Sequence, residues 1–522
     1  MNSNQKELLG VLKKFDSFCE EHKITYYLGG GTALGAIRHR GFIPWDDDID
    51  LYITRNNAEK LRKHKKELEE IRLCYIDQKE FPLYGNTIIR LSNLDDTMFH
   101  SARMIDKAPK GRMIELFILD PIPRDKDLQL QWKKKQWVYT ELIDTAFTAA
   151  NYNKLPYIDF SLYNFYLEKC QKEGTENVLL ELEEDLFSID EEDCDEYCIR
   201  WCGNDICFKK EWIGEPRKVI FEDAALPILP GAEFAFRTEY GNKWMYIPDV
   251  QETAHAFVLN ETVPYPVYVE DYSKFIDKDE IEEAYQGKKK ASIWRYVTIL
   301  NTLRKSQLLH KHRVIAKLKK DIVNGKPKDE LYETWKTTQL SPVFKSTKTY
   351  LPIEENHLYS AMVGMIKDGE YENVLEILSW KEKDEENTEE LKELQNFLLE
   401  ISEGYIEVYR DNISCAKKHI DRARELAPEL VSFDLLYLTL LLGIEENDEV
   451  ENLQQLADNC ESAISYYPNK PELLFVQGNA QRKLNNHKLA KFLYEKCAAQ
   501  TKNGMIYLYI KDYLKEYGGY ND

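Results

Sequence analysis

The chain has 522 residues, enough for two to four domains of ordinary size. Its composition, 43% hydrophobic and 31% charged, excludes wholesale disorder. Its formal net charge of −21 repels a phosphate backbone and argues against a nucleic-acid partner. The N-terminus has no apolar signal segment, and the longest clean apolar stretch, residues 435–444, is too short to span a bilayer. We therefore expect a cytoplasmic protein with reduced cysteines.

Residues 1–285 predict a mixed α/β domain. Apolar side chains recur at helical spacing over residues 5–22. A short strand is expected at 26–28, followed by three glycines and a short helix that Thr32 caps and that ends near His39. The pattern then predicts a strand at 46–54, a charged helix at 56–70, and strands at 73–77, 87–92 and 113–119, the last stopped by Pro121 and Pro123.

The rest of the chain changes character twice. Residues 286–349 predict a basic helical connector, in which 288–320 hold eleven positive charges and no Asp or Glu. This stretch suits either peripheral contact with the inner face of an anionic membrane or packing between two domains. Residues 350–522 predict an all-α domain with a degenerate, tetratricopeptide-like repeat. Such repeats suit a protein partner or self-association, and an irregular helical bundle is the alternative.

Carboxylates gather just after the glycine run. On a strand, Asp46, Asp48 and Asp50 would point to one face. Three carboxylates on one face repel each other, and a divalent cation relieves that repulsion. All-oxygen ligands favour Mg²⁺ or Mn²⁺ over zinc. The alternative, a solvated acidic turn, fits poorly with the apolar residues on both sides of the run.

The glycine turn before these carboxylates is a candidate phosphate-binding site. Gly30 and Gly31 open a helix, and exposed backbone N–H groups at such a turn bind phosphate. A phosphate site beside a metal held by carboxylates is the apparatus of phosphoryl or nucleotidyl transfer. Thr32 shares this turn, and Arg38, His39 and Arg90 are candidates for contacts with donor phosphates. For the last three residues, a surface cation is the alternative.

Residues 28–51, LGGGTALGAIRHRGFIPWDDDIDL, resemble the signature of the LicD/fukutin family. Residues 114–121, IELFILDP, resemble the second acidic strand of that family. Eight further residues resemble the C-terminal signature of the family: Trp212, Phe221, Glu222, Pro227, Pro230, Tyr240, Gly241 and Pro248. The resemblance covers about residues 5–250 and leaves out the helical tail.

The resemblance implies a nucleotidyltransferase-like fold and transfer of a phospho-alcohol from a CDP-linked donor to a sugar hydroxyl, with release of CMP. It implies Mg²⁺ or Mn²⁺ held by Asp48 and Asp50, with Glu115 as a third ligand or as the base. Glu115 stands where the family usually has Asp, and Asp46 is the other candidate base. The donor is expected to be CDP-choline. The acceptor is expected to be a cell-surface glycan, a lipid-linked glycan or a teichoic-acid precursor.

Two other functions remain open at this point. A nucleotidyltransferase acting on a small molecule would use the same strand chemistry and release pyrophosphate. A non-catalytic scaffold would use only the helical repeats, but the intact carboxylates argue against it.

Two further groups of residues invite a functional reading. The cysteines at 194, 198, 202 and 207 suit either zinc or, more commonly, small buried side chains along one face of a helix. The aromatic residues at 201, 212, 240, 244 and 246 suit cation–π contacts with choline, but core packing is their commoner use.

Overall fold

The computed structural model describes residues 1–81, 84–99, 108–143, 157, 159–201, 204–247, 258–260, 389–428 and 432–516. They form two compact units, residues 1–239 with 258–260 and residues 240–247 with 389–516. The predicted basic connector lies outside the described residues, so the domain bounds and the membrane contact stay predictions. Within the described part of the chain, no helix combines the length and apolar character needed to cross a membrane.

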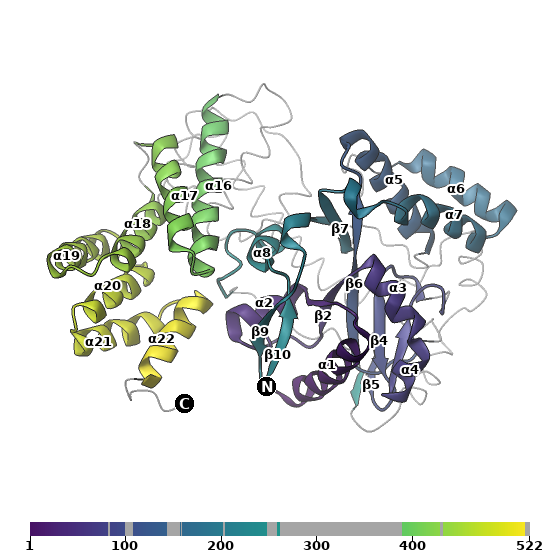
Figure 1. Cartoon of the computed structure of the whole chain (residues 1–522), viewed down its shortest axis with the longest axis horizontal. Helices are drawn as coiled ribbons and strands as arrows, with labels where there is room; N and C mark the ends of the chain where they lie inside the picture. The colour runs from purple at the N-terminus through teal and green to yellow at the C-terminus, as the bar shows by residue number, and fades with distance from the viewer. Residues whose placement is uncertain are drawn as a thin grey trace, which may run out of the picture. The chain divides into compact units, whose positions relative to one another are not determined.

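The first unit is built on a mixed sheet with the strand order β3-β4-β6-β2-β1-β10-β9, and β7 and β8 extend it from β6. β2 pairs parallel with β6, and β1 pairs parallel with β10, while the other neighbours are antiparallel (Figure 1). The strands are β1 (Tyr27–Leu28), β2 (Asp50–Thr54), β3 (Leu73–Ile76), β4 (Ile89–Asn93), β6 (Met113–Ile122), β7 (Glu196–Trp201), β8 (Asn204–Lys209), β9 (Arg217–Phe221) and β10 (Ala224–Ile228), with β5 (Thr97–Phe99) and β11 (Val258–Asn260) as a separate pair.

Helices surround this sheet. α1 contacts β6, α2 contacts β2 and β9, and α3 contacts β2 and β6. α5, α6 and α7 pack on one another beside β7 and share a core around Trp137 (Figure 1). The helices are α1 (Ser3–His22), α2 (Gly30–His39), α3 (Arg55–Lys63), α4 (Lys65–Glu70), α5 (Lys126–Ile143), α6 (Phe160–Glu173), α7 (Thr175–Phe187) and α8 (Ala232–Tyr240).

Local sequence explains where α1 begins and ends. Asn2 and Gln5 form a capping box, in which each side chain accepts a hydrogen bond from the other residue's backbone N–H. Lys23 ends the helix in the left-handed conformation. Leu8, Leu12 and Phe15 line the buried face, as their spacing predicts. The helix predicted at 5–22 is therefore confirmed.

Other element predictions need correction. The helix predicted at 56–70 breaks at His64 into α3 and α4. The strand predicted to stop before Pro121 runs to Ile122, because Pro121 pairs with Tyr197 of β7 at the end of the sheet. A proline lacks the N–H donor but keeps its carbonyl, so it is tolerated at such a position.

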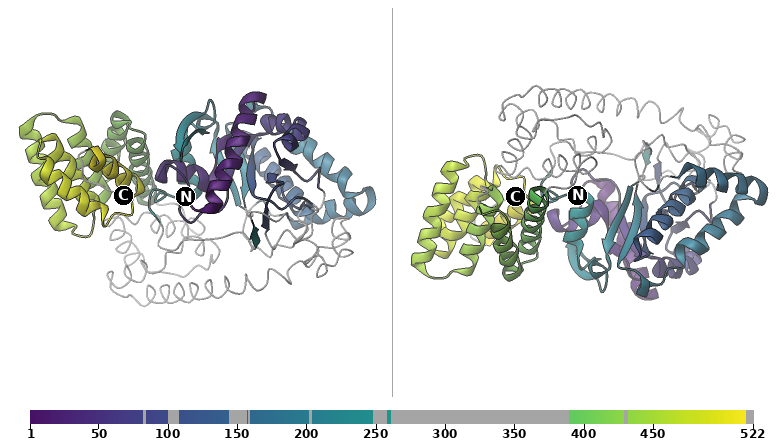
Figure 2. Two further views of the ribbon diagram at one scale, coloured as in Figure 1. Left: turned by 90° about the horizontal axis from the view of Figure 1, so that it is seen from below. Right: turned by 90° about the horizontal axis from the view of Figure 1, so that it is seen from above.

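The second unit is all helical. Figure 2 shows its helices stacked in successive pairs. The helices are α16 (Glu389–Tyr409), α17 (Ile413–Leu426), α18 (Phe433–Glu446), α19 (Val450–Tyr466), α20 (Glu472–Lys483), α21 (His487–Ala498) and α22 (Gly504–Glu516). The predicted order, a mixed α/β domain and then an all-helical region, is confirmed. The tetratricopeptide-like character of the region stays a prediction.

The segment at 240–247 is part of the helical unit, although the sequence analysis grouped it with residues 1–285. Ser402 of α16 donates a hydrogen bond to the side chain of Asn242 (2.7 Å). Tyr246 forms an isolated antiparallel bridge with Asn503, and the Trp244 ring lies 5.4 Å from that of Tyr409. Trp244 and Tyr246 are thus packing groups within this unit.

At Gly478, α20 packs tightly against the ring of Tyr494 in α21. A Cβ at this position would lie 2.5 Å from the ring of Tyr494, whose buried hydroxyl donates to Asn479. We expect Gly478→Ala to destabilise the helical unit by about 1–3 kcal/mol, because the ring has to shift. Calorimetry would detect this as a lower thermal midpoint. Gly10→Ala is the control, since Gly10 lies inside α1 with open space around it and should gain about 0.4–1 kcal/mol. An unchanged midpoint in Gly478→Ala would contradict the proposed close packing.

Candidate functional site

The site begins at the turn between β1 and α2. Gly30 opens α2 with φ of +47° and donates its N–H to the hydroxyl of Tyr52 (2.9 Å). A Cβ on Gly30 would lie 2.6 Å from a carboxylate oxygen of Asp50, and one on Gly31 would lie 3.0 Å from Asp46. Only glycines therefore let the start of α2 approach both carboxylates so closely.

The acidic loop 46–48 lies beside this turn. One carboxylate oxygen from each of Asp46, Asp47 and Asp48 lies within 4.8 Å of the other two. Residues of α1 hold the loop: Gln5 donates to the carbonyl oxygens of Ile43 (3.1 Å) and Asp46 (3.0 Å), and Asn4 donates to that of Asp47 (3.3 Å). Side-chain amides of α1 thus fix the backbone of the loop that carries the three acidic side chains.

The strand predicted at 46–54 is wrong in its first half, since β2 begins at Asp50. The backbone N–H of Asp46 donates a hydrogen bond to the carbonyl oxygen of Ile43 (2.9 Å), and the backbone carbonyl of Asp46 accepts one from the side chain of Gln5. The backbone of Asp46 therefore pairs within a turn and with α1 instead of with a neighbouring strand. Asp46 and Asp48 therefore do not share a strand face with Asp50. They approach it from a loop.

Asp50 is the buried centre of the group, with 3% of its surface exposed. Its N–H donates to the hydroxyl of Thr32 (2.9 Å), and its Oδ1 has no hydrogen-bond partner. Thr32 thus anchors β2 to α2 and is not the helix cap, a position that Gly29 takes. Burial first, and then the charges of Asp48, Glu115 and Asp46, raise the pKa of Asp50 well above its usual range.

Glu115 stands between Asp50 and Arg90 in the sheet register. It is opposite Asp50 across the parallel pair β2–β6 and opposite Arg90 across the antiparallel pair β6–β4. Arg90 and Glu115 form an ion pair, and both side chains are largely buried. The arginine therefore balances one carboxylate of the group. Its role toward donor phosphate, and that of Glu115 as ligand or base, stay predictions.

Arg38 and His39 lie in the last turn of α2, about 12 Å along the helix from Gly30. Burial and the neighbouring Arg38 lower the pKa of His39 to about 4, so its imidazole is neutral at physiological pH. Neither ring nitrogen of His39 has a hydrogen-bond partner, and the ring meets Trp45 edge to face at 6.1 Å. The contact of His39 with donor phosphate stays a prediction.

The structure adds two residues that the sequence analysis missed. The Tyr52 hydroxyl accepts a hydrogen bond from the backbone N–H of Gly30 and donates one to the carboxylate of Glu239 in α8 (2.6 Å). These two bonds connect the glycine turn to α8. In the sequence, Tyr52 belongs to the apolar flank of the acidic run, and no spacing links it to Glu239, which is 187 residues away. Asp120, in contrast, forms two 2.7 Å contacts with Arg55 and does not join the site, as the strand parity predicts.

The cysteine group is only partly described, because Cys202 lies outside the described residues. Cys198 and Cys207 face each other across β7 and β8 instead of lying on a helix. Burial raises the pKa of the Cys194 thiol, which donates to the carbonyl of Glu191 (3.3 Å). These features fit small buried side chains, and the zinc alternative stays untested.

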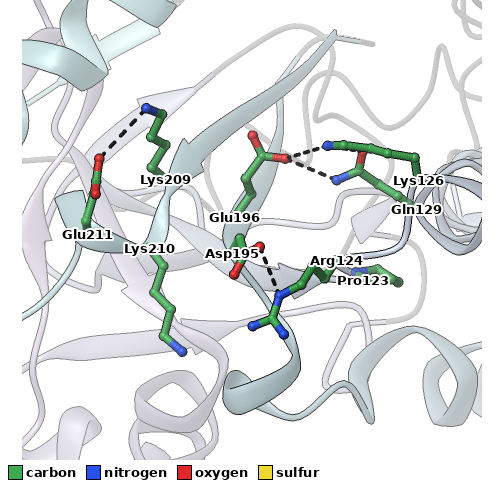
Figure 3. A pocket seen from close by; sticks show the side chains of 9 residues that line it. All are labelled: Pro123, Arg124, Lys126, Gln129, Asp195, Glu196, Lys209, Lys210 and Glu211. Atoms are coloured by element: carbon green, nitrogen blue, oxygen red, sulfur yellow. Dashed lines mark hydrogen bonds and ion pairs between the residues drawn. The ribbon is translucent and has the colours of Figure 1, made fainter.

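A cavity of about 640 Å³ lies between the end of β6, the start of α5 and the β7–β8 hairpin (Figure 3). It is lined by Pro123, Arg124, Lys126, Gln129, Asp195, Glu196, Lys209, Lys210 and Glu211. Arg124 pairs with Asp195 (2.9 Å) and Lys126 with Glu196 (3.5 Å), both at exposed positions. The lining thus holds four basic and three acidic side chains and includes none of the candidate site residues.

Residues 23–104 match the family model described as LicD/FKTN/FKRP, nucleotidyltransferase domain. This match confirms the predicted family resemblance over residues 23–104, while the resemblances at 114–121 and 212–248 and the helical tail lie outside the matched range.

Three relatives align with short parts of the chain. Lipopolysaccharide cholinephosphotransferase LicD of Haemophilus influenzae is 52% identical over 60 residues, which is 12% of this chain and 23% of that protein. An uncharacterised protein of Rickettsia prowazekii is 33% identical over 64 residues (12% and 24%), and one of Rickettsia typhi is 41% identical over 46 residues (9% and 15%). The chain thus spans about a quarter or less of each relative. No solved structure matches it significantly.

Proposed function

We propose that the first unit transfers phosphocholine from CDP-choline to a sugar hydroxyl of a cell-surface glycan or teichoic-acid precursor and releases CMP. The observation that carries this proposal is Asp50, a buried carboxylate with an unpartnered oxygen that lies directly against Gly30 of the glycine turn. The similarity to a cholinephosphotransferase over 60 residues supports choline as the alcohol.

The residues present fit a divalent cation. The unpartnered oxygen of Asp50, the raised pKa of that carboxyl and the close grouping of the loop 46–48 carboxylates together mark a concentration of acidic oxygens beside the glycine turn. Oxygen donors of this kind suit Mg²⁺ or Mn²⁺. Asp48 and Asp50 would hold the ion, with Glu115 as the third candidate. When bound, the ion would neutralise the donor diphosphate and the departing CMP.

The chain's own residues would then do the following work. Backbone N–H groups at Gly30 and Gly31 would bind a donor phosphate at the start of α2. The sugar hydroxyl oxygen would form a bond to the phosphorus that carries choline, and the bond from that phosphorus to the CMP oxygen would break. The hydroxyl proton would pass to Glu115 or Asp46. The ion pair with Arg90 favours the charged form of Glu115 and so weakens it as a base, which makes Asp46 the stronger candidate.

The direct test measures products with the full chain. The protein would be incubated with Mg²⁺ and CDP-choline, CDP-ethanolamine, CDP-glycerol or CDP-ribitol, with and without glycan acceptors. We expect CMP release and labelled choline in the glycan, with loss of both in Asp50→Asn. Asp223→Asn is the matched control, because Asp223 forms only an exposed pair with Lys13. Pyrophosphate release from a nucleoside triphosphate would instead indicate the alternative nucleotidyltransferase.

Glu115 allows a finer prediction. We expect Glu115→Asp, which keeps the charge, to retain measurable activity, and Glu115→Gln to lose at least about 100-fold, because a carboxylate in the site is neutralised. Initial rates of CMP release at saturating donor would measure this. If Glu115→Gln turns over like the parent, Glu115 is neither ligand nor base, and its role is to pair with Arg90.

A further inference from the structure

A second group of metal-binding side chains lies away from the acidic loop. His22 is the last residue of α1, His64 separates α3 from α4, and Glu67 lies in α4. One ligand atom from each lies within 4.8 Å of the other two. Among the described residues, the only other such group of three is the acidic loop itself.

The ligand atoms are already close to the spacing that a metal ion requires. Nδ1 of His64 lies 2.9 Å from one carboxylate oxygen of Glu67, and Nε2 of His22 lies 3.4 Å from the other. Zinc bonds of about 2.0–2.2 Å in a tetrahedron place neighbouring ligand atoms roughly 3.3–3.6 Å apart. The three side chains therefore need only small adjustments to share one ion.

Packing fixes the two imidazoles and leaves the carboxylate accessible. The His22 and His64 rings are 4.2 Å apart, and buried Phe18 lies 4.3 Å from His22 and 6.4 Å from His64. The side chains of His22, His64 and Glu67 are 16%, 33% and 47% exposed, so an ion can enter from solvent.

Five basic residues lie within two positions of these ligands in the chain, and two of them, Arg62 and Lys65, are drawn to other carboxylates. Arg62 pairs with Asp77 and Glu80, both at 3.4 Å, and Lys65 also pairs with Glu80. The charge of these two residues is thus partly compensated by acidic residues outside the histidine group, while Lys23, Lys63 and Lys66 add positive charge that a bound cation has to tolerate.

We propose that His22, His64 and Glu67 form a zinc site that joins the end of α1 to α4. Two imidazole nitrogens and one carboxylate are the ligands of a borderline divalent ion such as Zn²⁺, and they discriminate against Mg²⁺. With three protein ligands, the fourth position belongs to water. The site is independent of the proposed transferase chemistry, because it shares no residue with the acidic loop or the glycine turn.

Zinc binding to the full chain tests this proposal. The protein would be stripped with a chelator and titrated with Zn²⁺ against a chromophoric competitor, in excess Mg²⁺ to fill oxygen-only sites. We expect His22→Ala and His64→Ala to bind one zinc fewer than the parent with high affinity. Losing a group that merely supports a ligand costs about 10–100-fold in affinity, so losing a ligand should cost at least as much. Zinc should also raise the thermal midpoint of the parent more than that of either variant.

Controls separate a site from a lone histidine or a folding defect. His419→Ala removes a histidine that faces one carboxylate, Glu400 (2.6 Å), and should bind as much zinc as the parent. Asp50→Asn should also keep this zinc, which distinguishes failure here from failure of the proposed function. Glu67→Gln, at a half-exposed position, should weaken the site about tenfold or more without unfolding the protein. Equal zinc binding in the parent, His64→Ala and Glu67→Gln would overturn the proposal and leave the group as histidine–carboxylate ion pairs.

Discussion

Asp50→Asn is expected to stabilise the metal-free protein while reducing transferase activity to below about 1% of the parent. The loss of activity follows because the variant removes a charge aimed at the cation and the developing charge of the leaving group. The gain in stability follows because Asp50 is buried among other carboxylates and its Oδ1 has no partner. An asparagine amide can donate hydrogen bonds to those carboxylates, and relief of an unsatisfied buried group amounts to about 1–3 kcal/mol.

The pH dependence of stability provides an independent check. The folded protein raises the pKa of Asp50, so the folded state binds this proton more tightly than the unfolded state. Stability of the metal-free parent should therefore fall as pH rises from the ordinary aspartate pKa through the raised one, and this slope should be smaller in Asp50→Asn. Thermal midpoints measured across that range would show it.

Divalent metal should reverse the order of the two proteins. An ion at 100 times its dissociation constant stabilises the state that binds it by about 2.7 kcal/mol, so Mg²⁺ or Mn²⁺ should raise the midpoint of the parent and leave Asp50→Asn nearly unchanged. Asp223→Asn should follow the parent. A variant that loses stability without metal, or that responds to Mg²⁺ like the parent, would contradict the assignment of Asp50 as a ligand.

Much of this site follows from local sequence, because its parts are close in the chain. The glycine run, Thr32 and Asp50 lie within 22 residues, and a turn followed by a helix and a strand brings them together. The alternation of residues 113–119 puts Glu115 and Asp120 on opposite strand faces, and in the structure Glu115 lies opposite Asp50 while Asp120 contacts Arg55. At these residues, the short-range sequence pattern and the geometry of the sheet place the side chains in the same way.

The sequence could not show which distant groups complete the site. The alternation at 46–54 satisfies the rule for a strand, but the side-chain amide of Gln5 competes for the carbonyl oxygens of residues 43 and 46 and holds a loop there. Likewise, the pairing of Arg90 with Glu115 depends on the order of strands in the sheet, which periodicity does not specify. Tertiary hydrogen bonds and register, not local propensity, decide these positions.

Replacing Arg112 is expected to have a large effect on stability, because this residue links the acidic loop to the rest of the first unit. Its guanidinium donates to Asp96 (2.6 Å) and to Asn4 (2.8 Å), and Asn4 in turn donates to the carbonyl of Asp47. The side chains of Arg112 and Asp96 are 1% and 5% exposed. We expect Arg112→Met to lose about 3–5 kcal/mol of unfolding free energy, because it leaves the Asp96 charge buried without its counter-ion.

Two companion variants separate the buried charge from a general effect of losing an arginine. Arg72→Met breaks a pair with Asp95 whose side chains are 54% and 50% exposed, and should cost at most about 1 kcal/mol. Adding Asp96→Asn to Arg112→Met should recover part of the loss, because the unpaired charge is then removed and the backbone N–H of Arg112 keeps its acceptor. Calorimetric midpoints would rank the proteins. If the thermal midpoints of Arg112→Met and Arg72→Met fall by the same amount, the buried pair does not hold the loop in place. If they differ as expected, Arg112→Met should also need more Mg²⁺ for its midpoint to rise, since Asn4 then loses one of the contacts that position it against the acidic loop.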